Sequence, residues 1–285
     1  MIAVRTLIAS AILGVPGLVQ ADAMDQQQPF ARLSASRPAA IEANWTSLRL
    51  PTGNRIGLIG LNYLMAVDED WGFGPSVYGA AKGGYGGFFT AGFSAQRRWR
   101  MSQNTHLAVG LYAGAGGGLS SDKVRYGGGL MLRPELSLRT EVGNWYSGVS
   151  LAHVRFPSGN VSGSSIGLVL GRVNSFASFA PADAGRPARS NTRTGLGFDE
   201  ITLLVGAYQP RKNTRNRSGQ PSTGRMGQAG ADLRHYIAEG SWWGVDAVGA
   251  AQGGADGYMD LFANAGQDWA IGHPSLRLGA QLGLG

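Results

Sequence analysis

The chain has 285 residues, a formal net charge of +7, 46 glycines and no cysteine. The absence of cysteine excludes a disulfide framework and a thiolate metal site, and the glycines lack the strict three-residue period of collagen. No apolar run after residue 23 is long enough for a transmembrane helix, but a strand of a membrane barrel needs only about ten residues with alternate positions apolar.

Residues 1–23 indicate a secretory signal peptide. A single early charge, Arg5, precedes the apolar run LIASAILGVPGLV, and small residues at Ala21 and Ala23 suit cleavage. The alternative is a buried N-terminal helix, but QADAMDQQQP does not continue an amphipathic pattern. We expect the exported chain to begin near Asp22 or Met24, with residues 24–41 forming an N-terminal extension before a barrel domain over 42–285.

Apolar and polar residues then alternate along many segments, which is the period of a β-strand. The clearest segment is 130–140, where four leucines share one face and charged residues share the other. Turns rich in Gly, Asn and Asp separate the segments, as expected for antiparallel hairpins. This pattern predicts about twelve or thirteen strands, near 42–50, 55–66, 72–82, 86–99, 104–115, 126–140, 144–156, 164–176, 199–209, 228–239, 242–252, 257–269 and 275–284.

The fold class predicted is all-β, an antiparallel transmembrane β-barrel of about 12 strands in the outer membrane of a Gram-negative bacterium. Aromatic residues near the strand ends match the interfacial girdles of such barrels. A soluble secreted β-sandwich that binds a ligand is the alternative, since it also alternates. Charged residues in line opposite a leucine face favour the barrel. Its polar lumen is predicted to be lined by Arg133, Glu135, Ser137, Arg139, Asp260 and Arg277.

Part of the sequence resembles another part. A shift of 170 positions lays Gly79 on Gly249 and Trp99 on Trp269, so that 77–116 resembles 247–285. Repeated strand–turn–strand units are typical of closed sheets, because each unit needs neighbours for its edges. The strands that follow 116 have no counterpart after 285, and LGLG lacks the terminal aromatic residue usual for strands handed to the outer-membrane assembly machinery. We therefore expect a barrel incomplete at its C-terminus, in a piece of a longer protein lacking about three strands.

Two segments, 177–198 and 209–227, are rich in Pro, Gly, Ser, Asn and Arg and predict basic loops. They suit either a solvated surface or electrostatic contact with the phosphates of lipopolysaccharide. Nucleic acid is a poorer partner, because the basic stretches lack interleaved aromatic residues. The residues predicted to contact lipopolysaccharide are Arg186, Arg189, Arg193, Arg211, Lys212, Arg215 and Arg217.

Signals for chemistry are weak. None of the four histidines lies at metal-ligand spacing from another, which predicts no metal site, and nothing predicts a cofactor. The glycine-rich 113–118 lacks the helix or Lys-Ser/Thr of a phosphate-binding loop. We therefore predict a protein that acts without chemistry, as a channel for small hydrophilic or anionic solutes or, if its own side chains fill the barrel, as a structural surface protein.

The position of His153 depends on one turn. If the Gly143-Asn144 turn has two residues, Ser150 pairs with Ser137 and His153 faces lipid. A three-residue turn would reverse the faces and place His153 beside Glu135, as an acid–base pair in the lumen. The two-residue turn is favoured because it sets small residues beside long polar ones. It also predicts that Leu136→Arg disrupts the barrel, whereas a wet lumen accepts Ser137→Arg.

A histidine near a strand end, followed by a turn with Gly and Asn, resembles the lipid A 3-O-deacylase family of outer-membrane hydrolases. The resemblance covers 151–170 and implies a membrane-facing Ser-His-Glu site with His153 as the base. Arg155 and Phe156 stand where the family has Ser and Asn, which leaves Ser150 or Ser158 as displaced nucleophiles. A lipid A-modifying acyl hydrolase is thus the alternative function.

Overall fold

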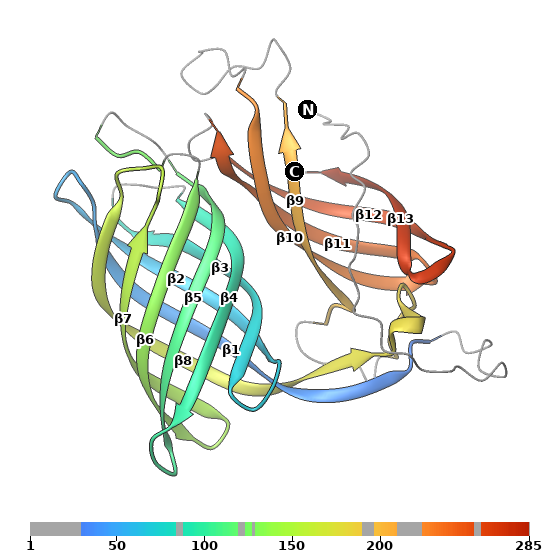
Figure 1. The fold of residues 1–285 in the computed structure, drawn as a ribbon, viewed down its shortest axis with the longest axis horizontal. Coiled ribbons are helices and arrows are strands. Elements are labelled where there is room, and N and C mark those ends of the chain that lie inside the picture. Colours follow the sequence, from blue (N-terminus) through green and yellow to red (C-terminus); the bar gives the residue numbers. More distant parts are fainter. Residues whose placement is uncertain are drawn as a thin grey trace.

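The computed structural model describes residues 30–83, 88–118, 123–126, 129–189, 197–209, 224–253 and 258–284. These residues form a closed barrel and a separate, open sheet beside it (Figure 1). The predicted signal peptide lies outside the described residues. Among the described residues, no helix is long and apolar enough to cross a membrane.

The barrel has eight antiparallel strands in chain order, and β8 pairs with β1 to close it. The predicted barrel of about 12 strands is therefore wrong. Alternation identifies individual strands, but it carries no information about which two edges meet. The strands are β1 (Leu33–Arg49), β2 (Arg55–Ala66), β3 (Trp71–Lys82), β4 (Phe89–Arg100), β5 (Thr105–Gly117), β6 (Leu130–Val142), β7 (Trp145–Arg155) and β8 (Ser162–Phe179).

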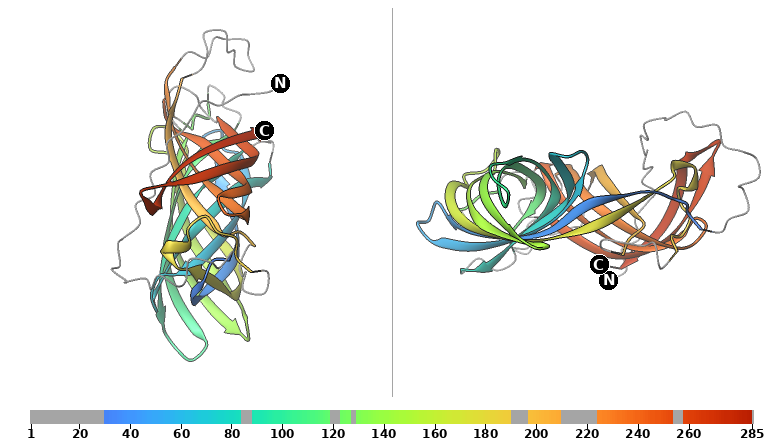
Figure 2. Two further views of the ribbon diagram at one scale, coloured as in Figure 1. Left: turned by 90° about the vertical axis from the view of Figure 1, so that its right-hand side faces the viewer. Right: turned by 90° about the horizontal axis from the view of Figure 1, so that it is seen from below.

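The remaining five strands form the second sheet, in the order β13-β12-β11-β10-β9. Figure 2 shows this curved, open sheet beside the ring of the barrel. Within the described residues, β13 pairs with β12 and not with β1, so the whole chain does not close as one barrel. The strands are β9 (Glu200–Tyr208), β10 (Met226–Ala238), β11 (Ser241–Gly253), β12 (Met259–Ile271) and β13 (His273–Leu284).

The barrel turns apolar side chains outward and polar side chains inward. On β6, Leu136 and Leu138 are 44% and 47% exposed, whereas Arg133 and Arg139 are 2% and 3% exposed. A soluble sandwich has the opposite polarity, with its apolar faces packed inside, so this alternative is wrong. The β6–β7 turn has two residues, and Ser137 pairs with Ser150, as the preferred register predicts.

The two ends of the barrel differ. Turns 67–70, 101–104 and 143–144 define the short-turn end. The opposite end, at which β1, β3, β5 and β7 finish and where the segments between strands are longer in the sequence, is called the long-loop end. Exposed tryptophans Trp71, Trp99 and Trp145 lie beside the short turns. The guanidinium of Arg97 lies 5.8 Å from the ring of Trp71 and 5.0 Å from that of Trp99. Such a belt of Trp and Arg is typical of a membrane–water interface.

A ribbon made by β1 and β8 leads from the barrel to the second sheet (Figure 1). Residues 177–179 belong to this ribbon and not to a loop, because β8 extends to Phe179. The single turn η1 (Pro181–Asp183) follows, and Arg32 Nε lies 2.8 Å from Asp183 Oδ2. Burial raises the pKa of Asp183, but the hydrogen bonds and charge of Arg32, with the charge of Arg186, outweigh it and hold the pKa below its usual value.

The barrel and the second sheet are in close backbone contact at two glycines, Gly129 and Gly249. A Cβ on Gly249 of β11 would lie 2.5 Å from the backbone carbonyl of Ala115 on β5. Gly129 has a φ of +87°, and a Cβ there would lie 2.1 Å from the carbonyl oxygen of Ala250. Both distances are far below a van der Waals contact, so a larger residue at either position would force the two sheets apart.

Candidate functional site: the interior of the barrel

Glu42 on β1 is the centre of a charged network inside the barrel, and its side chain is fully buried. Its Oε2 lies 2.6 Å from Nη1 of Arg139 and accepts a hydrogen bond of 2.9 Å from the hydroxyl of Tyr146. Its Oε1 accepts hydrogen bonds from the side-chain amides of Asn44, at 3.2 Å, and Asn62, at 3.1 Å. Four strands thus meet at one carboxylate, because the period of two turns each of these residues inward.

The network continues through β6. Arg133 Nη1 lies 2.5 Å from Glu135 Oε2 and donates a hydrogen bond of 3.1 Å to the hydroxyl of Tyr78. Arg139 Nη2 lies 3.5 Å from Glu135 Oε1. Two guanidinium groups and two carboxylates therefore balance each other, which is the condition for burying charge at tolerable cost.

This network fills the middle of the barrel. Ser137 is 2% exposed and accepts a hydrogen bond of 2.9 Å from Nε of Arg139. Arg139 also donates a hydrogen bond of 2.8 Å to Oε1 of Gln96, across the barrel on β4. Because Ser137 lies among these buried side chains, an arginine in its place would overpack the interior, and we expect Ser137→Arg to destabilise the barrel.

An apolar cluster closes the interior at the long-loop end. Aromatic rings pack against one another in it: the ring centroids of Tyr78 and Tyr112 are 4.6 Å apart in a tilted arrangement, and those of Tyr126 and Phe156 are 5.0 Å apart in an edge-to-face arrangement. The cluster joins strand ends to the loops that cover them. Its buried members are Leu48, Leu50, Ile56, Leu58, Tyr78, Phe88, Tyr112, Val124, Tyr126, Met131, Val154, Phe156 and Val161.

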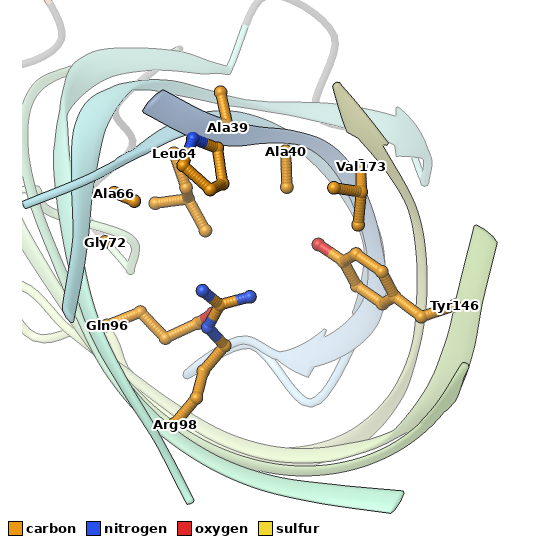
Figure 3. Close-up of a pocket in the computed structure, with 10 residues that line it drawn as sticks. Ala39, Ala40, Leu64, Ala66, Gly72, Gln96, Arg98, Tyr146 and Val173 are labelled. Atoms are coloured by element: carbon orange, nitrogen blue, oxygen red, sulfur yellow. The ribbon is translucent and has the colours of Figure 1, made fainter. Parts of the chain in front are cut away.

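A small pocket lies inside the opposite, short-turn end (Figure 3). Gln96, Arg98 and Tyr146 point into it, and the bond from Tyr146 to Glu42 links the pocket to the charged network. Its empty volume is about 350 Å³, including the open mouth. The other lining residues are Pro38, Ala39, Ala40, Leu64, Ala66, Gly72 and Val173.

Two residues predicted for the same lumen lie elsewhere. Asp260 is on β12 and Arg277 is on β13, in the second sheet, so neither shares an interior with Arg133. Arg277 Nη1 donates a hydrogen bond of 2.6 Å to the carbonyl of Ala184 in the linker, and Asp260 accepts one from Tyr258. β12 and β13 belong to a different sheet from β6, so their inward side chains do not line the barrel.

A second charged cluster lies on the inner face of that sheet. Arg234 Nε lies 2.6 Å from Asp232 Oδ2, and Arg234 Nη1 lies 3.0 Å from Asp268 Oδ2. The hydroxyl of Tyr236 donates to Asp268 at 2.9 Å. The outer face carries exposed Leu203, Val205, Leu261, Trp269, Leu278 and Leu282. The second sheet thus repeats the polarity of the barrel, with charge inside and apolar residues outside.

The structure describes two of the seven residues predicted to contact lipopolysaccharide, Arg186 and Arg189. Arg186 lies at the short-turn end, where the linker meets the β10–β11 turn: Gly240 N donates to Gly185 O at 2.7 Å. Arg189 is in the same linker, with its guanidinium 5.6 Å from the ring of Phe30. β9 begins near this end, at Glu200, and ends at Tyr208 at the other end of the second sheet. Arg193, Arg211, Lys212, Arg215 and Arg217 lie outside the described residues.

His153 faces outward at the edge of the apolar surface, between two serines. Its Nδ1 lies 2.9 Å from Ser164 Oγ, and its Nε2 lies 3.2 Å from Ser162 Oγ. Ser150 and Glu135 are buried on the opposite face, so the alternative with a three-residue turn, which paired His153 with Glu135, is wrong, and Ser150 cannot reach the imidazole. Ser158 lies in the β7–β8 loop. The sequence reasoning missed Ser162 and Ser164, although the register that turns His153 outward also pairs it with Ser164.

No protein-family model and no curated protein matches the chain. Among solved structures, the outer membrane protein Ail of Yersinia pestis is similar at 17% identity over 48% of this chain and 99% of that one, with a TM-score of 0.33. The β domain of the Bordetella autotransporter BrkA is similar at 15% identity over 84% of this chain and 87% of that one, with a TM-score of 0.20. The class of protein is defined by the chain's own geometry: a closed, eight-stranded antiparallel β-barrel with a polar interior.

Proposed function

We propose that this chain is an integral outer-membrane β-barrel with a structural or surface role. The observation that carries the proposal is the polarity of the barrel, with leucines and tryptophans outside and a hydrogen-bonded charged network inside. A surface of this kind is stable in hydrocarbon and unstable in water, because a bilayer solvates apolar side chains and the closed sheet pairs its own backbone groups. Signal-peptide cleavage, export and handling by the assembly machinery belong to the same proposal.

The filled interior favours a structural role over a channel. Solutes would have to pass the apolar cluster at the long-loop end and then the balanced pairs around Glu42 and Glu135. An eight-stranded barrel is just wide enough for its own side chains to fill. Opening a path would therefore require breaking buried ion pairs, at several kcal/mol for each uncompensated charge.

Lipopolysaccharide is the surface partner we propose, at the long-loop end. Barrels of this class place short turns in the periplasm and long loops outside. β9 ends on the outer side in that orientation. We propose that the basic residues that follow β9 in the sequence, Arg211, Lys212, Arg215 and Arg217, are attracted by the anionic phosphates. Arg186 and Arg189 fall on the periplasmic side, so the linker is not included in this contact.

Purified protein reconstituted in a planar bilayer tests the filled barrel. We expect no steady unitary current, because the ion pairs and aromatic rings block the path. Insertion is checked in the same bilayers by protease treatment of the loops. Steady unitary currents from inserted protein would contradict the structural role and restore the channel.

The hydrolase is not proposed as a second function. In acyl hydrolases of the Ser-His type, a carboxylate holds the ring nitrogen that faces away from the nucleophile. Here both ring nitrogens of His153 face serine hydroxyls, and none of the described ion pairs joins His153 to a carboxylate. The comparisons give no support for a relation to the lipid A deacylases.

A further inference from the structure

The outer face of the barrel carries a row of basic residues at its long-loop end. Four exposed residues of this kind stand at strand ends there: Arg49 on β1, Arg55 on β2, Lys82 on β3 and Arg155 on β7. We call this set the basic patch. Its side chains point outward, because Arg49 and Arg155 each follow an exposed apolar residue of the same strand by four positions, and side chains an even number of positions apart share a face.

Strand pairing brings the members of the basic patch side by side. Arg49 pairs directly with Arg55 on β2. Lys82 pairs with Gly57, where a Cβ would lie 3.2 Å from the Cβ of Lys82, so the lysine lies beside Arg55 on the same face. On the other side of Arg49, Arg155 of β7 pairs with Ser162 of β8. Neighbouring strands are about 4.8 Å apart, so the row from β7 to β3 extends over roughly 19 Å of the barrel wall.

Two further exposed cations, Lys123 and Arg125, are held at the same end by the β7–β8 loop. Asn160 Nδ2 donates a hydrogen bond of 2.9 Å to the carbonyl of Lys123, and Arg125 N donates one of 2.8 Å to Asn160 Oδ1. Among the described residues, none of these six cations forms an ion pair. Because like charges repel one another, such a cluster is stabilised by an anion from outside the chain.

The two ends of the barrel differ in charge. Within the described part of the barrel, the carboxylates outside the interior all lie beside the short turns: Asp68, Glu69, Asp70 and Glu141. The long-loop end therefore attracts anions with no described carboxylate of the barrel to repel them. In the orientation proposed above, this end faces the outer leaflet.

Apolar side chains lie directly below the basic patch on the same outward face. Ile166 and Leu168 of β8 are 79% and 64% exposed, and Ile166 is two positions from Ser164. Trp45 and Leu151 extend this apolar surface on the two neighbouring strands. An anion that fits both surfaces is an amphiphile, with hydrocarbon against the strands and its charged group at the height of the cations.

His153 adds hydroxyl donors to the row of cations. Its two ring nitrogens contact Ser164 Oγ at 2.9 Å and Ser162 Oγ at 3.2 Å. A neutral imidazole donates at one nitrogen and accepts at the other, so one serine accepts from the ring and keeps its own O–H for another acceptor. Ser162 is paired with Arg155, which sets a hydroxyl beside a guanidinium. Phosphate oxygens accept from both groups.

The basic patch lies on the side of the barrel away from the second sheet. That sheet contacts the barrel mainly through β4, β5 and β6. In the closed ring β5 lies across from β1, so the patch faces the surrounding membrane. A lipopolysaccharide headgroup is broader than that of a phospholipid and carries more than one phosphate. It therefore suits a row of cations that extends from β7 to β3.

We propose that the basic patch, together with Ser162 and Ser164, binds the phosphate groups of lipopolysaccharide, whose acyl chains lie against the apolar surface below. The proposal rests on the proposed function, because it names strand residues that contact the surface partner. It assigns the contact to the wall of the barrel, in addition to the basic residues that follow β9.

Binding of fluorescently labelled lipid A to the refolded full chain in detergent micelles, followed by fluorescence polarisation, tests the proposal. The patch variant carries Arg49→Gln, Arg55→Gln and Arg155→Gln. The matched control carries Arg37→Gln, Arg100→Gln and Arg172→Gln, which remove the same charge from exposed positions at the short-turn end. A mobility shift on boiling shows that each variant has folded.

We expect the patch variant to bind lipid A on the order of 100-fold more weakly than the natural chain, because each basic residue near an anionic lipid surface adds about fivefold in affinity. The short-turn control should bind as the natural chain does. Ser162→Ala with Ser164→Ala should weaken binding about fivefold, through the loss of hydroxyl donors. Unlabelled lipid A should displace the label far better than dephosphorylated lipid A, phosphatidylglycerol or inorganic phosphate.

Equal binding by the patch variant and the natural chain would overturn the proposal, as would an equal loss in the short-turn control. Displacement by dephosphorylated lipid A, phosphatidylglycerol or inorganic phosphate as effective as that by lipid A would also contradict it. Failure of the proposed function looks different: a natural chain whose mobility does not shift on boiling has no closed barrel. A closed barrel that binds lipid A equally well without the patch defeats this inference alone.

Discussion

Replacing Glu42 by methionine is expected to destabilise the barrel by about 3–5 kcal/mol, because it leaves a buried guanidinium without its main partner. Arg139 Nη1 lies 2.6 Å from the Glu42 carboxylate, whereas the nearest contact of Arg139 with Glu135 is 3.5 Å. Tyr146 would lose the acceptor of its hydroxyl in the same change. Urea unfolding in lipid vesicles, followed by tryptophan fluorescence, measures the loss.

The double variant Glu42→Met, Arg139→Met is the control. It removes both members of one ion pair and leaves Arg133 with Glu135, so most of the lost stability should return. If Glu42→Met alone cost less than about 1 kcal/mol, water would be solvating Arg139, and the interior would be an open lumen after all.

Replacing Leu136 by arginine is expected to cost about 2–4 kcal/mol, because it places a charge on the outer face near the middle of a membrane-spanning strand. Leu136 is 44% exposed and lies centrally on β6. The same unfolding measurement in vesicles gives the cost, and a severe defect would appear first as failure to refold.

Val142→Arg is the matched control for this face. Val142 ends the same strand, points the same way and is 76% exposed, but it lies at the short-turn end beside the belt of tryptophans. An arginine there reaches the interface and should cost only about 0–1 kcal/mol. Equal costs at the two positions would mean that no depth-dependent hydrocarbon layer surrounds the barrel.

The sequence predicts correctly which side chains of β6 and β7 point outward. It does not predict which strands pair to close the barrel. Alternation along 130–140 placed Arg133 and Arg139 opposite the leucines, and the Gly143-Asn144 turn was enough to set the register between Ser137 and Ser150. Both features are local. The choice between one barrel of about 12 strands and a barrel of eight with a separate sheet depends on which distant edges pair, and the β1–β8 pairing leaves no periodic signal.

The alternation of the sequence also does not show that side chains fill the interior of the barrel. Tyr78, Tyr112 and Tyr146 occupy inward positions, and the same residues could line the water-filled channel of a porin. Periodicity therefore does not distinguish a water-filled interior from a packed one. Glu42 belongs to a short alternating run and carries no motif, and its role appears only when four strands bring its partners together. His153 was placed on the correct face, but its serine neighbours lie on β8, across a strand pair.

The central claim is that this chain folds as a closed barrel in the outer membrane, and electrophoretic mobility of unboiled protein tests it most directly. Cells expressing the chain are fractionated, and outer-membrane extracts are run on gels with and without boiling. A closed barrel resists detergent until heated, so we expect the protein in the outer-membrane fraction with a mobility that boiling shifts. Recovery of the protein in the soluble periplasmic fraction, with one mobility before and after boiling, would contradict the account.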